Sequence, residues 1–391
     1  MLNQEVYDKV VAKFAEKFGA KPEVVSYAPG RIEVLGNHTD YNEGYVFSAA
    51  IDKGTFFAAS PAADDKVTLV AIDMDETCET TLGAVAKVES GATWANYPLG
   101  TFNWLMGGEP AKAGKGFKAV FGGNIPLGAG LSSSAALEMA TALALQKVYG
   151  TAFGKTELAK IGQKAEHTFA GCPCGLLDQA SSMYGQAGAL VKSDFRTNEF
   201  ESVPMGDGVA FMMVKSNAKH ALVDGAYASR RQACEDAAKH FAGVLRKKVT
   251  HLRDVTMAEW VLYRGGLSET TARRAVHPIG EDERVLQGAA LLEKGDLQGF
   301  GALMYDSHES SRNWFENSCE ELDAIVDAAK AIPEVYGARL SGGGFGGSCC
   351  LLVDPAAADR ISAQISKEYK AKFGDEPTCS LIKPSEGAHL V

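Results

Sequence analysis

The sequence has no apolar stretch that approaches the length of a membrane span, and its first residues lack the uninterrupted apolar core of a signal peptide. Residues 1–19 are instead charged and amphipathic, with Val6, Val10 and Phe14 at helical spacing. These absences predict a cytoplasmic protein that does not bind a membrane.

The chain also lacks an excess of basic residues, because 39 Lys and Arg stand against 49 Asp and Glu and give a net charge of −10. Binding nucleic acid independently of its sequence requires a basic surface, so we expect no nucleic-acid partner. The eight cysteines lack zinc-ribbon spacing, and only Cys172 with Cys174, or Cys349 with Cys350, are close together. We interpret the cysteines as buried reduced thiols.

What the chain does contain is typical of a globular enzyme of the α/β type: 46% hydrophobic residues, 23% charged residues and 42 glycines. Its 391 residues exceed what one hydrophobic core usually serves, so we expect two domains, residues 1–195 and 196–391. Predicted strands and helices are interleaved. The predicted strands are residues 67–72, 118–121, 209–214 and 349–353. The predicted helices are residues 133–149, 156–169, 226–245, 320–331 and 356–372.

Two glycine-rich stretches look like nucleotide motifs without matching them. Residues 150–156 read GTAFGKT, one residue short of a P-loop, and we expect Gly150 to close one helix and Thr156 to cap the next. Residues 342–347 read GGGFGG, but an apolar strand follows where a dinucleotide fingerprint requires a helix. The sequence therefore predicts neither a P-loop nor a Rossmann site.

The strongest local signal is the run NIPLGAGLSSSAA at residues 124–136, which leads directly into a predicted helix. Its glycines permit a sharp turn and a close approach to a ligand. Its serines open the helix, where unpaired N–H groups and the helix dipole attract phosphate. A turn with a serine cap would explain one glycine and one serine, whereas this run predicts a phosphate cradle without a Walker lysine. The residues expected around the phosphates are Gly128, Gly130, Leu131, Ser132, Ser133 and Ser134.

This run resembles the phosphate-binding motif of the GHMP kinases, and two further stretches are similar to motifs of the same family. Residues 28–44, APGRIEVLGNHTDYNEG, are similar to the signature of its galactokinase branch. Residues 337–348, GARLSGGGFGGS, are similar to the third family motif. The resemblance covers nearly the whole chain. It implies an α/β domain followed by an α+β domain, an active site in the cleft between them, and ATP-dependent phosphorylation of the C1 hydroxyl of a galactose-like hexose.

The resemblance also implies catalytic roles. Phosphoryl transfer to an alcohol needs a divalent metal, a cation and a group that orients or deprotonates the hydroxyl. Asp178 would face the reacting hydroxyl, and Arg31 would lie beside it and keep it ionised. Ser134 and Glu166 would bind Mg²⁺, which accepts few protein oxygens. Whether Asp178 removes the proton or positions the hydroxyl stays open.

Sugar recognition follows the same resemblance. Asp40 is similar to the residue that accepts hydrogen bonds from two adjacent ring hydroxyls, at C3 and C4, which would select the axial C4 hydroxyl of galactose. Taken alone, a His, Tyr or Trp more often packs in a core, so the remaining contacts depend on the family match. The sugar contacts predicted in this way are Asn37, His38, Asp40, Gly175, Asp178 and Tyr227, and the predicted adenine contacts are Trp94 and Tyr97.

Two positions depart from the galactokinase pattern, which has Asn at position 33 and Glu at position 37. This chain has Glu33 and Asn37. Exchanging a carboxylate for an amide removes a strong acceptor and adds a donor. Either Glu33 restores the charge and galactose remains the substrate, or Asn37 admits the C6 carboxylate of galacturonate. We favour galactose because Asp40, Asp178 and Tyr227 are in place.

Two rival functions stay open. One is a related kinase acting on another substrate, such as N-acetylgalactosamine, mevalonate or homoserine, although HTDYN at residues 38–42 argues against the non-sugar members. The other is a galactose- and ATP-binding sensor without catalysis, which should have a damaged phosphate motif, whereas residues 132–136 are complete. We expect a monomer or a weak homo-oligomer.

Overall fold

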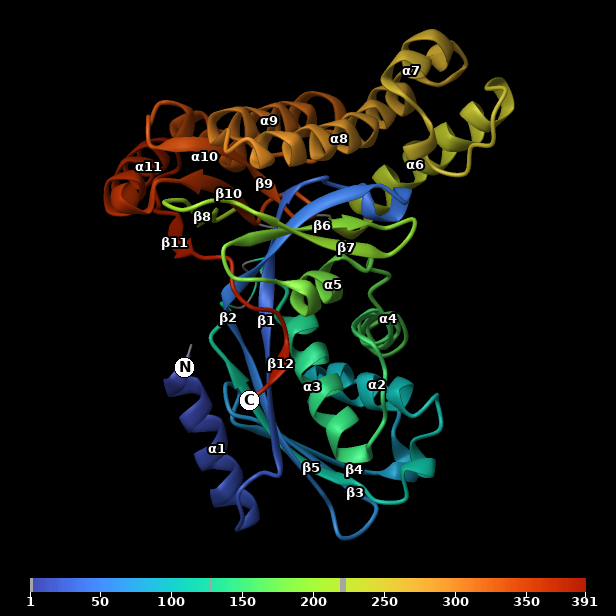
Figure 1. Cartoon of the computed structure of the whole chain (residues 1–391), viewed down its shortest axis with the longest axis vertical. Helices are drawn as coiled ribbons and strands as arrows, with labels where there is room; N and C mark the ends of the chain where they lie inside the picture. Colours follow the sequence, from blue (N-terminus) through green and yellow to red (C-terminus); the bar gives the residue numbers. More distant parts are fainter. Residues whose placement is uncertain (1–2, 127, 129, 219–222) are drawn as a thin grey trace.

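A computed structural model describes residues 3–126, 128, 130–218 and 223–391 (Figure 1). Most of the first half of the chain lies in the lower part of the figure and most of the second half in the upper part, and the long strands β1 and β2 run between them. The first half contains α1 (Gln4–Phe18), β1 (Val24–Leu35), β2 (Tyr45–Pro61), β3 (Lys66–Ala71), β4 (Glu76–Thr81), α2 (Asn96–Leu105), β5 (Phe117–Gly123), α3 (Ser133–Tyr149), α4 (Lys155–Ala165), α5 (Leu177–Tyr184) and β6 (Ala189–Asp194). The second half contains β7 (Glu199–Pro204), β8 (Ala210–Lys215), α6 (Val223–Val244), α7 (Met257–Tyr263), α8 (Glu269–Glu293), α9 (Leu297–Ser310), α10 (Glu320–Lys330), β9 (Val335–Ser341), β10 (Ser348–Val353), α11 (Ala358–Phe373), β11 (Thr378–Ile382) and β12 (His389–Leu390).

The strands form two sheets. The first follows the order β12-β1-β2-β5-β3-β4, and β6 pairs with β2 and with β7. Its neighbours are antiparallel except for β3 and β5, as far as the described strands show. The second sheet has the antiparallel order β11-β8-β10-β9. The predicted mixture of helices and sheets is confirmed. Although helices and strands alternate along much of the chain, most neighbouring strands are antiparallel.

A shared apolar core joins the two halves. Ile32 on β1 and Phe47 on β2 belong to the same buried cluster as Phe211 on β8 and Phe300 on α9. Separate clusters lie beneath α2 and α3 on the first sheet, beneath α1 on its other face, and beneath α10 and α11 on the second sheet. Because β1 contributes to the shared cluster, the second half is packed directly against the strand that carries the N-terminal motif.

The predicted elements are confirmed with shifts of a few residues at their ends, and the helix after the phosphate motif is found at its predicted bounds. Gly150 ends α3 with φ 66°, as expected. The prediction that Thr156 caps α4 is wrong, because Gly154 is the N-cap and the Thr156 hydroxyl hydrogen-bonds the hydroxyl of Tyr184 at 2.7 Å. Residues 342–347 connect β9 to β10, so a strand follows them, as predicted.

The predicted domain boundary after residue 195 falls in the turn between β6 and β7. These strands pair with each other, and β6 joins the first sheet through β2. The division at residue 195 stays a prediction; the strand pairing favours a boundary between β7 and β8. At the far end of the chain, β12 returns to pair with β1 (Figure 1).

Within the described ranges, no helix combines the length and apolarity that crossing a membrane requires. All eight cysteines lie in these ranges and are thiols rather than disulfides. The prediction that they are buried is confirmed for Cys234, Cys349 and Cys350. It is wrong for Cys172, which is exposed because it lies on the loop before α5 rather than in an apolar layer.

Candidate active site

The N-terminus of α3 follows a tight loop in which Gly128, Gly130 and Ser132 have φ values of 66°, 72° and 55°. Leu127 and Ala129 of the same motif lie outside the described residues. The first N–H groups of a helix have no partner within it, so this end of α3 can bind phosphate. Leu131 is buried in the core cluster shared by the two halves and so anchors the loop.

Arg31 and Asp178 form an ion pair next to this loop. Arg31 Nε donates to Asp178 Oδ1 at 2.7 Å, and Nη2 lies 2.7 Å from the same oxygen. Arg31 Nη1 donates to the carbonyl of Gly130 at 2.6 Å. The hydroxyl of Ser132 does not cap α3 but donates to Asp178 Oδ2. The carboxylate of α5, the guanidinium of β1 and the phosphate loop therefore meet at one point.

A glycine on β1 makes this close approach possible. Gly30 precedes Arg31, and a Cβ at position 30 would lie 2.4 Å from the carbonyl oxygen of Leu131. The N–H of Arg31 donates to that carbonyl at 3.0 Å. A side chain at position 30 would push the phosphate loop away from β1 and separate it from Arg31.

Ser134 and Glu166 lie together on the other side of the loop. The Ser134 hydroxyl donates to Glu166 Oε1 at 3.2 Å, while Oε2 accepts from Gln179 Nε2 at 2.8 Å and from Cys174 Sγ at 3.1 Å. Burial, with the nearby charge of Asp178, raises the pKa of Glu166. No group of three His, Cys, Asp or Glu side chains among the described residues could enclose a metal. One hydroxyl and one carboxylate nevertheless fit Mg²⁺, which usually keeps waters and binds substrate phosphates.

Asp40, Gly175 and Tyr227 line one cavity of about 560 Å³. A Cβ at position 175 would lie only 1.8 Å from Asp40 Oδ2, so glycine is required for the carboxylate to take its place. Burial raises the pKa of Asp40 to about 7, and the charge of Glu33 adds to the effect. Burial likewise raises the pKa of Tyr227. This cavity is lined by directional polar groups of the kind that a sugar requires.

His38 makes protein contacts with both ring nitrogens. Nε2 lies 3.1 Å from the carbonyl oxygen of Gly343, and Nδ1 lies 2.8 Å from the Tyr41 hydroxyl. Burial lowers the pKa of His38 to about 4, so the ring is neutral. Nε2 must then carry the proton, since a carbonyl can only accept. The His38 ring also packs against Tyr227 in a tilted arrangement, with ring centroids 5.1 Å apart, and so supports the cavity wall.

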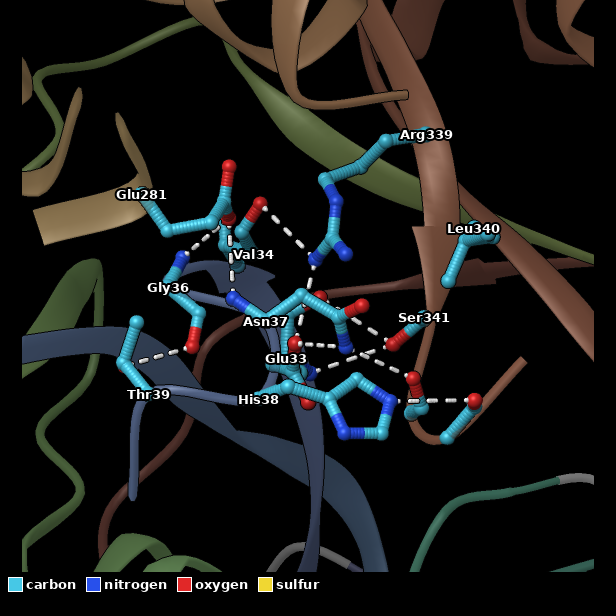
Figure 2. Close-up of polar contacts among 12 residues, drawn as sticks. Glu33, Val34, Gly36, Asn37, His38, Thr39, Glu281, Arg339, Leu340 and Ser341 are labelled. Atoms are coloured by element: carbon cyan, nitrogen blue, oxygen red, sulfur yellow. Dashed lines mark hydrogen bonds and ion pairs between the residues drawn. The ribbon is translucent and has the colours of Figure 1, made fainter. Parts of the chain in front are cut away.

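Asn37 is held even more completely by protein groups (Figure 2). Its Nδ2 donates to Glu33 Oε1 at 2.8 Å and to the Gly342 carbonyl at 2.7 Å. Its Oδ1 accepts from Asn317 Nδ2 at 3.0 Å. Arg339 Nη1 reaches the same Glu33 oxygen at 3.2 Å. The amide at position 37 therefore binds neighbouring residues of both halves.

A second cavity, of about 490 Å³, is lined by Trp94, Tyr97, Ser133 and Ser134. Trp94 Nε1 donates to Glu76 Oε2 at 2.5 Å, which fixes the indole. Trp94 and Tyr97 provide an aromatic wall for this cavity, and the first residues of α3 provide another, an arrangement that suits a nucleotide. Asp178 is linked to residues of both cavities: it accepts from Ser132, which precedes Ser133 of this cavity, and it comes three residues after Gly175, which lines the first.

Sequence reasoning did not select several residues of this region. Gln179 follows Asp178 directly, so its position was a usable signal. Arg339 and Asn317 reach Glu33 and Asn37 from about 300 residues away, and no local pattern marks them. In the sequence, Glu33 stands out only as a departure from the galactokinase pattern.

Three family models match the chain. The galactokinase galactose-binding signature matches residues 12–61, the N-terminal domain of the GHMP kinases matches residues 96–186, and their C-terminal domain matches residues 289–371. Galactokinase from Homo sapiens is 39% identical, with coverage of 97% of this chain and 95% of the relative. Galactokinase from Bos taurus is 40% identical over 99% of this chain and 97% of the relative.

Solved structures agree with these matches. The structure of Lactococcus lactis galactokinase complexed with galactose has a TM-score of 0.90 and 30% identity, and covers 98% of this chain and 99% of that one. A mevalonate kinase structure has a TM-score of 0.62 at 19% identity over 93% of this chain and 100% of that one, which shows a shared fold. With near-complete coverage at 39–40% identity to galactokinases and a galactose-binding signature over β1, this chain belongs to the galactokinase family of GHMP kinases.

Proposed function

We propose that this protein is a sugar kinase that transfers the terminal phosphoryl group of ATP to the C1 hydroxyl of galactose, giving galactose 1-phosphate and ADP. The observation that supports it most strongly is the Arg31–Asp178 ion pair at the loop that opens α3, near residues that line the two cavities. Full-length similarity to galactokinases, one of them solved with galactose, supports the same reaction.

In this mechanism the sugar lies against Asp40, Gly175 and Tyr227 with its C1 hydroxyl at Asp178. The carboxylate accepts the hydroxyl proton as the C1 oxygen bonds to the terminal phosphorus, and the bond from that phosphorus to the bridging oxygen of ADP breaks. Arg31 holds Asp178 by its guanidinium and stabilises negative charge on the phosphoryl group. The N–H groups that open α3 bind the other phosphate oxygens.

Mg²⁺ would be held by Ser134 and Glu166, and it would neutralise phosphate charge when bound with ATP. The nucleotide base would occupy the cavity at Trp94 and Tyr97. The Asp40 carboxylate would accept from two adjacent hydroxyls and so favour the axial C4 hydroxyl of galactose. The cytoplasmic location and the monomeric or weakly associated state stay predictions.

The assay that tests this proposal compares galactose, galacturonate and N-acetylgalactosamine with purified protein, ATP and Mg²⁺. ADP is followed by enzymatic coupling, and the product is identified by ³¹P NMR. We expect the highest kcat/KM with galactose and a phosphate on C1. A preference for galacturonate would identify a related sugar kinase. Binding of galactose and ATP without any ADP above the sugar-free rate would identify a sensor.

The kcat/KM for galactose should depend on pH through the ionisation of Asp40. Its pKa is raised to about 7, so the carboxylate accepts two hydrogen bonds above that pH and loses an acceptor when it is protonated below it. We therefore expect kcat/KM for galactose to fall about tenfold for each pH unit below about 7, with kcat less affected. An Asp40→Asn variant should be slow and should lack this acidic limb. Retention of the same limb in the variant would assign it to another group.

A further inference from the structure

We propose that Glu33, rather than Asn37, reads the C6 hydroxyl of the sugar: one carboxylate oxygen of Glu33 is held by the protein, and the other accepts a hydrogen bond from that hydroxyl. This inference rests on the proposed function and names the group that makes it specific. The two reversed residues then have separate roles: Glu33 contacts the sugar, and Asn37 holds Glu33 in place.

The direction of Glu33 is set by β1. Side chains two residues apart on a strand point to the same face, so Glu33 shares the face of Arg31, which reaches Asp178. The charge of Glu33 also acts on Asp40, where it is the largest influence on the carboxyl pKa after burial. Glu33 therefore borders the region that contains both Asp178 and Asp40.

The two oxygens of Glu33 have different environments. Oε1 accepts from Asn37 Nδ2 at 2.8 Å and lies 3.2 Å from Arg339 Nη1. Oε2 accepts no hydrogen bond from the described part of the chain, and the side chain keeps 6% of its surface accessible. Oε2 is not among the fully buried oxygens that lack a partner, so it keeps some accessible surface and can accept a hydrogen bond from a ligand.

Asn37 has no free donor, and its oxygen already accepts one hydrogen bond. Its two amide hydrogens bind Glu33 and the Gly342 carbonyl, its oxygen accepts from Asn317, and only 1% of the residue is exposed. Its backbone N–H donates to Glu281 Oε2 at 2.8 Å. Asn37 is therefore a brace that joins the N-terminal motif to the glycine-rich loop after β9 (Figure 2).

Two residues of β9, in the second half of the chain, hold Glu33 in place. Ser341 bridges the backbone of Glu33, accepting from its N–H at 3.2 Å and donating to its carbonyl at 3.0 Å. Arg339, two residues earlier on β9, is fully buried and pairs with the Glu33 side chain. Because β9 and β1 are docked in this way, Glu33 cannot swing aside to admit a different C6 group.

The hydroxyl assignment follows from the proposed orientation of the sugar. With C1 at Asp178 and the C3 and C4 hydroxyls at Asp40, the hydroxyls left are those at C2, next to the reacting carbon, and at C6, at the far end. Asp178 is held by Arg31 and Ser132, with which the Glu33 carboxylate shares no hydrogen bond. Glu33 instead hydrogen-bonds Asn37, in the segment that also carries Asp40, which places it at the far end. A C6 carboxylate there would be repelled by Glu33 and by Asp40.

The test is a two-by-two comparison of wild type and Glu33→Gln with galactose and 6-deoxygalactose. A glutamine has one oxygen, so it cannot accept from both the protein and the sugar. We expect a loss in kcat/KM for galactose of about 10- to 100-fold, as for a hydrogen bond to a charged group, and little further loss for 6-deoxygalactose. In wild type, 6-deoxygalactose should already be worse than galactose by a similar factor. The ratio of kcat/KM for galacturonate to that for galactose should rise about tenfold in Glu33→Gln.

Asn37→Ala is the matched control at the neighbouring position. Asn37 is one of two groups that hold Glu33 Oε1, and Arg339 remains when it is removed. This variant should therefore lower kcat/KM for galactose by less than Glu33→Gln does and should keep most of the preference for galactose over 6-deoxygalactose. Equal losses for both sugars in Glu33→Gln would overturn the proposal, as would a wild type that uses both sugars equally well. Should Glu33→Gln fail to fold, the wild-type comparison still decides.

Calorimetric binding of the two sugars to wild type separates this inference from the proposed function. A protein that binds galactose at least tenfold more tightly than 6-deoxygalactose but makes no sugar phosphate would support the C6 contact while the kinase assignment fails. Equal affinities with normal galactose turnover would leave the kinase assignment intact and overturn the role of Glu33.

Discussion

Asp178→Asn should lower kcat by about 10²- to 10⁴-fold, the range in which a positioned acid–base group usually contributes. Asparagine keeps the shape of the side chain but cannot take the hydroxyl proton, and its amide group must face either Arg31 or Ser132. Galactose affinity should change only a few-fold, because Asp40, Gly175 and Tyr227 remain. Single-turnover phosphate transfer together with calorimetric galactose binding measures the two effects separately.

The chain offers a matched control for this variant. Asp194 pairs with Arg253 at 2.8 Å, also between two parts of the chain, and both side chains are mostly buried. Asp194→Asn breaks an Arg–Asp pair whose two residues line neither cavity, so it should lower thermal stability and leave kcat near wild type. An Asp178→Asn protein that kept full turnover would defeat the mechanism, whatever its stability.

The parts of the site that depend on short stretches of chain were predictable from the sequence. The helix over residues 133–149 follows from its apolar pattern and from Gly150 at its end, and the Gly128 and Gly130 turns follow from their residue type. The meeting of residues 31, 132 and 178 was expected from a family resemblance and not from local pattern. The structure shows these side chains in contact, while their roles remain proposals.

What could not be predicted depends on contacts between distant segments. Whether His38 and Asn37 face the sugar or the protein is decided by Gly343, Gly342 and Asn317, which lie 280 to 305 residues further along the chain. The β6–β7 hairpin shows the same limit, since composition near residue 195 gives no sign that β7 adds to the first sheet. Local sequence specifies a side chain's chemistry, but its partners are set by the packing of the two halves.

Glu166→Gln should weaken the binding of a divalent ion with nucleotide by more than about tenfold. Replacing a residue that only supports a metal ligand typically costs at least about tenfold, and Glu166 is proposed to be a ligand itself. Glu166 presents Oε1 to Ser134 while Gln179 and Cys174 hold Oε2, so an amide at this position loses charge and meets a donor from Gln179. Mn²⁺ can replace Mg²⁺ as a probe. Its binding in the presence of ADP, followed by electron paramagnetic resonance, does not depend on turnover.

Glu138→Gln is the control that separates charge at the metal from packing. Gln179 Nε2 donates to Glu138 Oε2 at 2.9 Å as it does to Glu166, but Glu138 is fully buried within the core. Burial raises the pKa of Glu138 well above its ordinary value, which favours the neutral acid, and glutamine is also neutral. We expect unchanged Mn²⁺ affinity in Glu138→Gln and a large loss in Glu166→Gln. Equal losses in the two variants would mean that the pair acts through the packing of Gln179, and the assignment of Glu166 as a metal ligand would be wrong.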